Sequence, residues 1–385
     1  MDTASLREWL AVSLAEQIGP IRFHALLSHF QHPRAVLAAT ASELASVGLP
    51  AAAIHALQQP DWPRVDATLT WAATQSNAHL LTLHDPQYPR LLRHIPDPPP
   101  VLFVLGDVTC LQQTQIAIVG SRHPSPAGEE NAFAFAAELA SAGIVITSGM
   151  ALGIDAAAHR GALSVNGFTL AVAGTGLDRI YPAQHHALAH QISTQGALIS
   201  EFPLGTQPSA GNFPRRNRLI SGMSHGVLVV EAATQSGSLI TAHHAIEQGR
   251  EVFALPGSIH NTHAKGCHEL IRQGAKLVES VAHILEELPP TFAENSTAYA
   301  MPAGHNEAVT ESPQEAALLA AMDDAPASVE RIIQRSGLTA DAVCSILLLL
   351  ELQGKVQMTT AGQYCRVYLR TNDERKHSRC IDVPV

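Results

Sequence analysis

The sequence has few cysteines, few aromatic residues and no excess of positive charge. Its five cysteines are far apart and form no CxxC pair or other close metal-ligand spacing. This pattern argues against a disulfide framework or a zinc finger and indicates a reduced, cytoplasmic protein. Because the formal net charge is −10 at pH 7, cations do not coat the chain, and any site for a polyanion must be local.

Long apolar runs are also missing. The apolar run at residues 345–352 is far too short to cross a membrane. The first twenty residues contain acids and an early Arg-Glu pair, where a signal peptide would need basic residues followed by an apolar stretch. We therefore expect neither a membrane span nor a secretion signal.

The 385-residue chain is long enough for two or three domains. Residues 1–80 are rich in alanine and leucine at helical spacing, with breaks at residues 18–20 and 47–50. We interpret them as a small helical module of the SAM or helix-hairpin-helix kind. The proline-rich stretch at residues 86–100 is typical of a boundary between domains.

Six apolar segments alternate with helical patterns in residues 81–288. Such alternation is typical of a doubly wound, mainly parallel sheet with helices on both faces. We therefore predict the α/β class, with an extended Rossmann-like domain at its centre. The predicted strands lie in residues 115–120, 144–149, 169–174, 197–202, 225–232 and 251–257.

The C-terminal part has a different pattern. Residues 289–312 are rich in small and polar residues and are interpreted as a linker. Residues 313–372 show three helical patterns and then strand-like alternation, which predicts a winged-helix domain followed by a tail at 373–385. The third helical pattern, residues 339–354, has no Lys or Arg. Helices that read a DNA groove need such donors, so we expect this helix to pack or to dock a protein.

Small and polar residues occur where the predicted strands give way to helices. Ligands bind outside the carboxyl ends of parallel strands, and the helix N-termini found there attract anions. We therefore expect a bound anion at this edge of the sheet. The residues predicted to contact it from these loops are Gly120, Ser121, Arg122, Gly149, Gly153, Gly174, Gly176, Ser236, Gly237 and Ser238.

The segment FPRRNR, residues 213–218, concentrates cations within this acidic chain. We expect Asn212 to cap a helix that begins here. Arg215 and Arg218 are three residues apart and would share a helix face, and guanidinium groups suit phosphate oxygens. The segment therefore predicts a phosphate-bearing ligand. Its predicted contacts are Phe213, Arg215, Arg216, Asn217 and Arg218.

An alternative is that these arginines stabilise the domain by pairing with Asp155, Asp178 or Glu201. A second alternative concerns Asp155 and His159, which would share a helix face as an acid/base pair. We favour a structural role for Asp155, in which its carboxylate accepts backbone hydrogen bonds and fixes the loop before its helix. Among the 21 histidines, the HHALAH spacing resembles a ligand pair, but no HExxH motif or third ligand accompanies it, so we expect no metal.

Common nucleotide-binding motifs are absent. The segment AGTGLDR has only two of the glycines of GxGxxG, and no GxxxxGK[ST] loop occurs. This weakens the case for a redox enzyme or a nucleoside triphosphatase, and we expect no cofactor.

Several segments, in order over about residues 80–285, resemble the DprA/Smf family of DNA-processing proteins. They include IAIVGSR, ITSGMALGIDAAAH, VAGTGLDRIYP, FPRRNRLISGMS and SGSLITAHHAIEQGREVFALPGS. The resemblance implies a cytoplasmic, DNA-binding mediator of recombination that is not an enzyme. It would bind and protect single-stranded DNA during natural transformation (competence) and help to load the RecA recombinase.

By the same resemblance, residues 120–122 match the family's phosphate-contacting G-S/T-R loop, and the arginines of FPRRNR match its basic DNA-facing stretch. The family also forms homodimers through its Rossmann-like domain. One departure is Leu152, which stands where many relatives carry Arg or Lys. Leucine supplies no cation at this position, so Arg122 would contribute more to binding.

Single strands are bound by a positive groove with aromatic residues on which bases stack. Tyr181, Phe202 and Phe213 are candidates for stacking, with the alternative that Tyr181 and Phe213, each followed by a proline, pack a turn. The alternative function is a nucleotide-cleaving Rossmann enzyme that hydrolyses nucleoside monophosphates, like the phosphoribohydrolases, whose PGGxGTxxE loop supplies a glutamate. Here EAATQSGSLITA keeps Gly237 and Thr241 but has no glutamate after the glycine, so we favour binding without catalysis.

Overall fold

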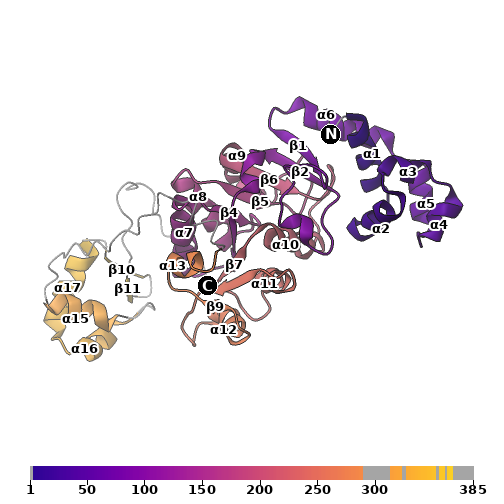
Figure 1. The fold of residues 1–385 in the computed structure, drawn as a ribbon. Helices are drawn as coiled ribbons and strands as arrows, with labels where there is room; N and C mark the ends of the chain where they lie inside the picture. Colours follow the sequence, from indigo (N-terminus) through magenta and orange to yellow (C-terminus); the bar gives the residue numbers. More distant parts are fainter. Residues whose placement is uncertain (1–2, 289–312, 323–326, 353–354, 360–361, 367–385) are drawn as a thin grey trace. The chain divides into compact units, whose positions relative to one another are not determined.

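The computed structural model describes residues 3–288, 313–322, 327–352, 355–359 and 362–366 (Figure 1). The predicted linker at 289–312, the tail at 373–385 and the last residues of the predicted winged helix, 367–372, lie outside the described residues. The chain divides into two compact units, residues 1–300 and 301–385.

The first unit begins with a helical module. The predicted breaks coincide with helix boundaries, since α2 begins at Pro20 and α5 directly follows Pro50, where proline can start a helix but not continue one. The buried Trp9 and Phe23 belong to the same hydrophobic cluster as Phe103 of the sheet, so module and sheet pack as one unit. The helices are α1 (Thr3–Ser13), α2 (Pro20–Phe30), α3 (Pro33–Ala38), α4 (Ala41–Ser46), α5 (Ala51–Gln58) and α6 (Trp62–Thr74).

A nine-stranded sheet follows, in the order β1-β2-β6-β5-β4-β3-β7-β8-β9. In this order, the seven strands β6, β5, β4, β3, β7, β8 and β9 pair in parallel with one another. Strand β2 pairs antiparallel with β6, and β1 pairs antiparallel with β2 at the edge. The strands are β1 (Ala78–Thr82), β2 (Val101–Gly106), β3 (Gln115–Gly120), β4 (Val145–Ser148), β5 (Thr169–Val172), β6 (Gly196–Ser200), β7 (Gly226–Val230), β8 (Glu251–Ala254) and β9 (Lys276–Leu277).

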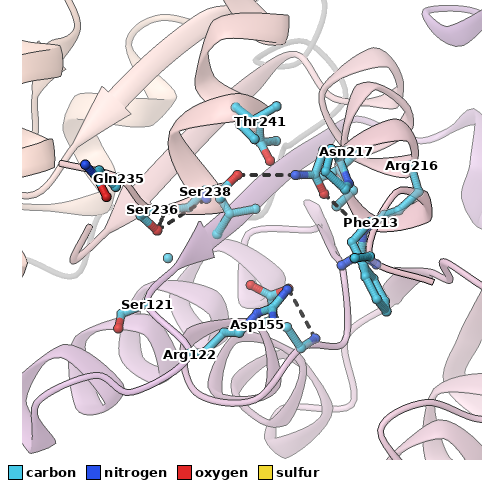
Figure 2. Close-up of a pocket in the computed structure, with 18 of the residues that line it drawn as sticks. Ser121, Arg122, Asp155, Phe213, Arg216, Asn217, Gln235, Ser236, Ser238 and Thr241 are labelled. Carbon is cyan, nitrogen blue, oxygen red and sulfur yellow. Dashed lines mark hydrogen bonds between the residues drawn. The ribbon is translucent and has the colours of Figure 1, made fainter. Parts of the chain in front are cut away.

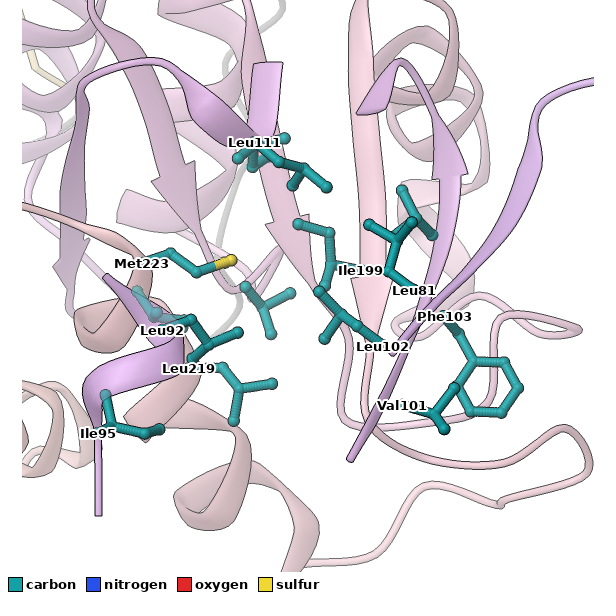
Figure 3. Packing of buried hydrophobic residues seen from close by; sticks show 14 of the residues in the cluster. Leu81, Leu92, Ile95, Val101, Leu102, Phe103, Leu111, Ile199, Leu219 and Met223 are labelled. Carbon is teal, nitrogen blue, oxygen red and sulfur yellow. The ribbon is translucent and has the colours of Figure 1, made fainter. Parts of the chain in front are cut away.

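All six predicted strands are confirmed, as β3 to β8, and the doubly wound parallel sheet with them. Three strands were not predicted: β1, β2 and the two-residue β9. The proline-rich stretch at 86–100 connects β1 to its antiparallel partner β2, so the interpretation as a boundary was wrong. The backbone of β2 pairs with β6, and Figure 3 shows Leu81 and Leu102 of the added strands beside Ile199 of β6, so side-chain packing also holds them to the sheet.

Helices cover both faces of the sheet because successive strand residues point to opposite faces. In β3, Ile116 and Ile118 pack in a cluster with α7, α8 and α13, whereas Ala117 and Val119 belong to the cluster that includes α9 to α12. The helices are α7 (Pro126–Ser141), α8 (Ile154–Ser164), α9 (His186–Gln195), α10 (Asn212–Met223), α11 (Gly237–Glu247), α12 (Lys265–Arg272) and α13 (Val281–Leu285), with short 3-10 turns η1 (Leu92–His94), η2 (Val108–Gln112), η3 (Ala183–His185) and η4 (Thr262–Ala264).

The strand order reverses at β3. The chain moves from β3 through β4, β5 and β6 to one side, then crosses to β7, on the other side of β3, and continues to β8 and β9. At such a switch point the loops after the two central strands diverge to opposite faces and leave a crevice at their carboxyl ends. The fold therefore places a crevice between the loops that follow β3 and β7.

The second unit is the predicted winged helix. Three helices, α15 (Pro313–Ala321), α16 (Val329–Ser336) and α17 (Ala340–Leu352), precede an antiparallel pair, β10 (Val356–Met358) and β11 (Tyr364–Arg366). Its own hydrophobic core includes Leu318, Ile332, Leu347 and Val356. Leu348 and Leu349 of α17 are exposed, so this helix presents apolar rather than cationic side chains to solvent.

Candidate nucleic-acid interface

A cavity of about 780 Å³ occupies the switch point (Figure 2). Its walls come from the loop after β3, the start of α8, the start of α10, and the loop after β7 with the first turns of α11. The predicted residues that line it are Gly120, Ser121, Arg122, Phe213, Arg216, Asn217, Ser236, Gly237 and Ser238.

The loop after β3 forms one wall. A Cβ at Gly120 would lie 1.9 Å from the carbonyl oxygen of Val230, so only glycine lets this turn approach β7 so closely. Arg122 is exposed at the cavity, 5.8 Å from the ring centre of Phe213. None of the ion pairs found within the described residues involves Arg122. Its guanidinium group is therefore available to an anion.

The start of α8 supports the floor of the cavity. Asp155 is buried, and its Oδ2 accepts the N–H groups of Gly149 and Ala151, both at 3.2 Å. Burial raises the pKa of this carboxyl, while the nearby Arg216 and Arg122 oppose the rise. Gly153 caps the helix with a φ of +74°, which favours glycine. The favoured interpretation of Asp155 as a loop-fixing carboxylate is thus confirmed.

His159 does not form the alternative acid/base pair with Asp155. Its Nδ1 is hydrogen-bonded to the hydroxyl of Thr169 at 2.7 Å, inside the protein. Burial lowers the pKa of His159 to about 3, so the ring is neutral at physiological pH. Searched over the described residues, the chain has no group of three His, Cys, Asp or Glu side chains that could hold a metal ion.

Arg216 is the buried arginine of the cavity wall. Its guanidinium group donates to the carbonyl oxygens of Gly149, at 2.5 Å, and Val172. A Cβ at Gly149 would lie 2.2 Å from the Arg216 Nη2, so Gly149 is there to make room for this side chain. Burial lowers the pKa of Arg216 to about 10, which still leaves it charged at neutral pH. It joins α10 to the carboxyl ends of β4 and β5 and adds one positive charge to the wall.

Arg215 and Arg218 lie apart from the cavity. Arg218 is buried and pairs with Glu201, and its Nε lies 3.2 Å from the Asp97 Oδ2. Arg215 is half exposed, with its Nε 3.2 Å from the Glu201 Oε1. These two arginines thus follow the alternative interpretation, in which Glu201 holds them within the domain.

Burial raises the pKa of the Glu201 carboxyl, and the charges of Arg218 and Arg215 oppose that rise. Its carboxylate is almost inaccessible, with 2% of the side chain exposed. Arg215 also lies 5.3 Å from the ring of Phe202, and both residues line a separate cavity of about 330 Å³ beside the turn between α1 and α2. The side chains of the FPRRNR segment therefore enter three environments: the switch-point cavity, the separate cavity and the buried ion pair with Glu201.

The aromatic candidates divide in the same way. Tyr181 and Phe213 line the switch-point cavity with ring centres 5.4 Å apart, and Tyr181 is 48% exposed. Phe202 is buried at the separate cavity. A Cβ at Gly174 would lie 2.9 Å from the ring of Phe213. Gly174 thus allows Phe213 to pack here.

The loop after β7 forms the opposite wall. Ser236 caps α11, and its hydroxyl accepts the N–H of Ser238 at 3.3 Å. Asn217 of α10 donates to the carbonyl oxygen of Gly237 at 3.3 Å, which ties α10 to this loop. The N-terminus of α11 therefore points at the cavity with its partial positive charge. Figure 2 shows Ser236 and Ser238 across the cavity from Arg122.

Some details differ from the predictions. Gly149, Gly153, Gly174 and Gly176 do not line the cavity. The cap of α10 is Gly211, and Asn212 instead donates from its side chain to the carbonyl oxygen of Gly174, so the prediction for Asn212 was wrong.

Among the other lining residues, the polar ones that were not predicted as part of this site are His123, Ser209, Gln235, Thr241 and His263. His123 and Gln235 directly follow or precede predicted loop residues, so counting one more residue at each loop would have found them.

The described residues contain no single helix that is long and apolar enough to cross a membrane. One strongly bent pair, Val329–Ser336 with Ala340–Glu351, meets the length and composition test only when combined.

The sequence matches two protein-family models. A family model described as DNA recombination-mediator protein A matches residues 79–289, and one for the DprA winged helix domain matches residues 302–362. The chain is 46% identical to protein Smf of Escherichia coli over 305 residues, 77% of this chain and 80% of that protein. It is 43% identical to DNA processing protein DprA of Bacillus subtilis over 231 residues, 60% of this chain and 76% of that protein.

Solved structures agree with the family models. DNA processing protein A of Streptococcus pneumoniae is similar with a TM-score of 0.66 and 34% identity, covering 74% of this chain and 98% of that one. DprA of Helicobacter pylori, solved to explain its single-stranded DNA binding mode, gives a TM-score of 0.50 and 30% identity, covering 58% and 99%. With one family model spanning more than half of the sequence, the chain belongs to the DprA/Smf family of DNA-processing proteins.

Proposed function

We propose that this protein binds single-stranded DNA in the switch-point cavity. The observation that carries the proposal is the meeting of three features in one cavity: the unpaired Arg122, the aromatic pair Tyr181 and Phe213, and the N-terminus of α11. Cations and helix N-termini attract phosphates, and exposed aromatic rings stack with unpaired bases. The related Helicobacter pylori protein, which binds single-stranded DNA, supports the same assignment.

In this proposal a phosphate lies between the loop of Gly120, Ser121 and Arg122 and the loop of Ser236 and Ser238. A neighbouring base stacks on the exposed face of Tyr181 or Phe213. Buried Arg216 acts as a fixed charge behind the phosphate, because its hydrogen bonds are already made to backbone carbonyls.

We propose binding without catalysis. Among the lining residues of the cavity, the only carboxylate is Asp155, and it is fixed by two backbone N–H groups. A glycosidic hydrolase needs a carboxylate that can approach the sugar, so this arrangement favours binding over the phosphoribohydrolase alternative. We further propose that the protein is a cytoplasmic homodimer. It would protect the strand and help to load RecA during natural transformation, which fits the matching family model, described as a DNA recombination mediator. Faster assembly of RecA filaments on protected single strands would test it.

We expect single strands to bind more tightly than duplexes of the same length. The cavity offers contacts to backbone and unstacked bases, whereas α17, the helix in the position of a groove reader, has no cation. Fluorescence anisotropy with both oligonucleotides across a salt series measures the difference. Equal or tighter duplex binding at the same salt concentration would contradict the proposal.

We also expect that removal of residues 313–385 changes single-strand affinity by less than about tenfold. The winged helix belongs to a separate compact unit, and its helix α17 has no Lys or Arg and exposes leucines, so we expect few phosphate contacts from it. The same anisotropy titration, with sedimentation to check that the oligomeric state is kept, measures this. A larger loss with the oligomeric state unchanged would assign DNA contacts to the winged helix.

A further inference from the structure

One acidic residue, Glu231, holds both ends of the loop at residues 121–125, one end through its backbone and the other through its side chain. The backbone N–H of Ser121 donates to the carbonyl oxygen of Glu231 at 2.8 Å. The backbone N–H and the hydroxyl of Ser125 donate to the Glu231 carboxylate at 2.8 and 2.5 Å. Glu231 directly follows β7, so it ties the loop after β3 to the start of the loop that forms the opposite wall of the cavity.

The local backbone is shaped to allow this contact. Glu231 has a φ of +52°, in the left-handed region that non-glycine residues rarely adopt. Gly128 is the third residue of α7, the position at which a capping box normally carries Glu or Gln. A Cβ at Gly128 would lie 2.4 Å from the Glu231 Cδ. Glu231 therefore takes, from another part of the chain, the place of a local capping glutamate.

We propose that Glu231 is a positioning residue for DNA binding: it holds Ser121 and Arg122 at a fixed distance from the Ser236 wall. A local glutamate at position 128 would cap α7 equally well but would leave the Ser125 end of the loop untied, with only the backbone hydrogen bond of Ser121 joining the loop to residue 231. The use of a residue directly after β7 is explained if the separation of the two cavity walls matters to the ligand. This inference rests on the proposed function, because it assigns the loop a phosphate contact.

The experiment separates capping from positioning. Glu231→Ala should lower both the melting temperature and the affinity for an oligothymidylate, the latter by about tenfold, the scale of one charged hydrogen bond. In the double variant Glu231→Ala with Gly128→Glu, the new glutamate enters the vacated space and caps α7 locally. We expect the melting temperature to recover and the affinity to stay low. Recovery of both would show that Glu231 only caps the helix and would overturn the proposal.

Two further measurements keep the result decisive. Glu231→Ala added to Arg122→Ala should weaken binding little beyond Arg122→Ala alone, because both changes act through one loop. If Arg122→Ala itself binds normally, the proposed DNA site fails, whereas a loss in Arg122→Ala without one in Glu231→Ala overturns only the role of Glu231. Should Glu231→Ala not fold, Glu231→Gln, which keeps an acceptor for the Ser125 N–H, should fold and bind several-fold more weakly, and unchanged affinity would count against positioning.

Discussion

Replacing Arg218 by alanine is expected to lower the free energy of unfolding by about 3–5 kcal/mol, the usual cost of removing one partner of a buried ion pair. The side chains of Arg218 and Glu201 are only 7% and 2% exposed. Without Arg218, the Glu201 carboxylate would stay buried with only the half-exposed Arg215 beside it. Urea unfolding followed by circular dichroism measures the change.

Arg215→Ala is the matched control, because it removes a guanidinium group from the same carboxylate. Arg215 is 48% exposed, so water screens its interaction with Glu201, and we expect a clearly smaller loss than for Arg218→Ala. A similar loss for the two variants would contradict the assignment of Arg218 as the buried partner. Arg218→Ala protein that remains folded should keep its salt dependence of DNA binding, since Arg218 does not line the cavity.

The central sheet could be predicted from the sequence because each parallel strand is buried on both faces and therefore reads as a continuous apolar run. Residues 115–120 and 225–232 are such runs, and β3 and β7 lie within them. The segment that forms β2, VLFVLG, is equally apolar, but the prolines before it favour a domain boundary in the sequence and hide the strand. The two residues of β9, Lys276 and Leu277, are too few to give any period.

The candidate site was predictable as a set of loops but not as a set of side-chain directions. Arg215, Arg216 and Arg218 are close in sequence, yet each faces a different environment, since α10 turns by about 100° per residue. Which of these directions is buried depends on Glu201, Asp97 and the carbonyl group of Val172, which come from distant segments. The sequence alone therefore supports both a phosphate contact and an ion pair for these arginines. It does not show which arginine has which role, because that depends on tertiary contacts.

Arg122 is the residue for which the DNA-binding proposal makes its sharpest prediction. Arg122→Ala should weaken single-strand binding by about 10- to 100-fold, the range for a hydrogen bond to a charged group. The slope of log affinity against log salt concentration should become less steep by about 0.7, the value for one phosphate on a single strand. Because phosphate contacts carry no base information, the loss should be similar for different oligonucleotide sequences. Anisotropy titrations between about 50 and 200 mM salt, the range over which such slopes are usually read, measure both quantities.

The structure offers a matched control for charge. Arg160 is an exposed arginine on α8 whose guanidinium pairs with Glu129, outside the cavity. Arg160→Ala changes the net charge by the same amount as Arg122→Ala and should leave both affinity and slope nearly unchanged. Arg122→Lys keeps the charge but loses the two-pronged guanidinium geometry, so it should keep the slope and recover only part of the affinity. Binding by Arg122→Ala with the original slope, or equal losses for Arg122→Ala and Arg160→Ala, would show that long-range charge rather than a phosphate contact at Arg122 attracts the strand.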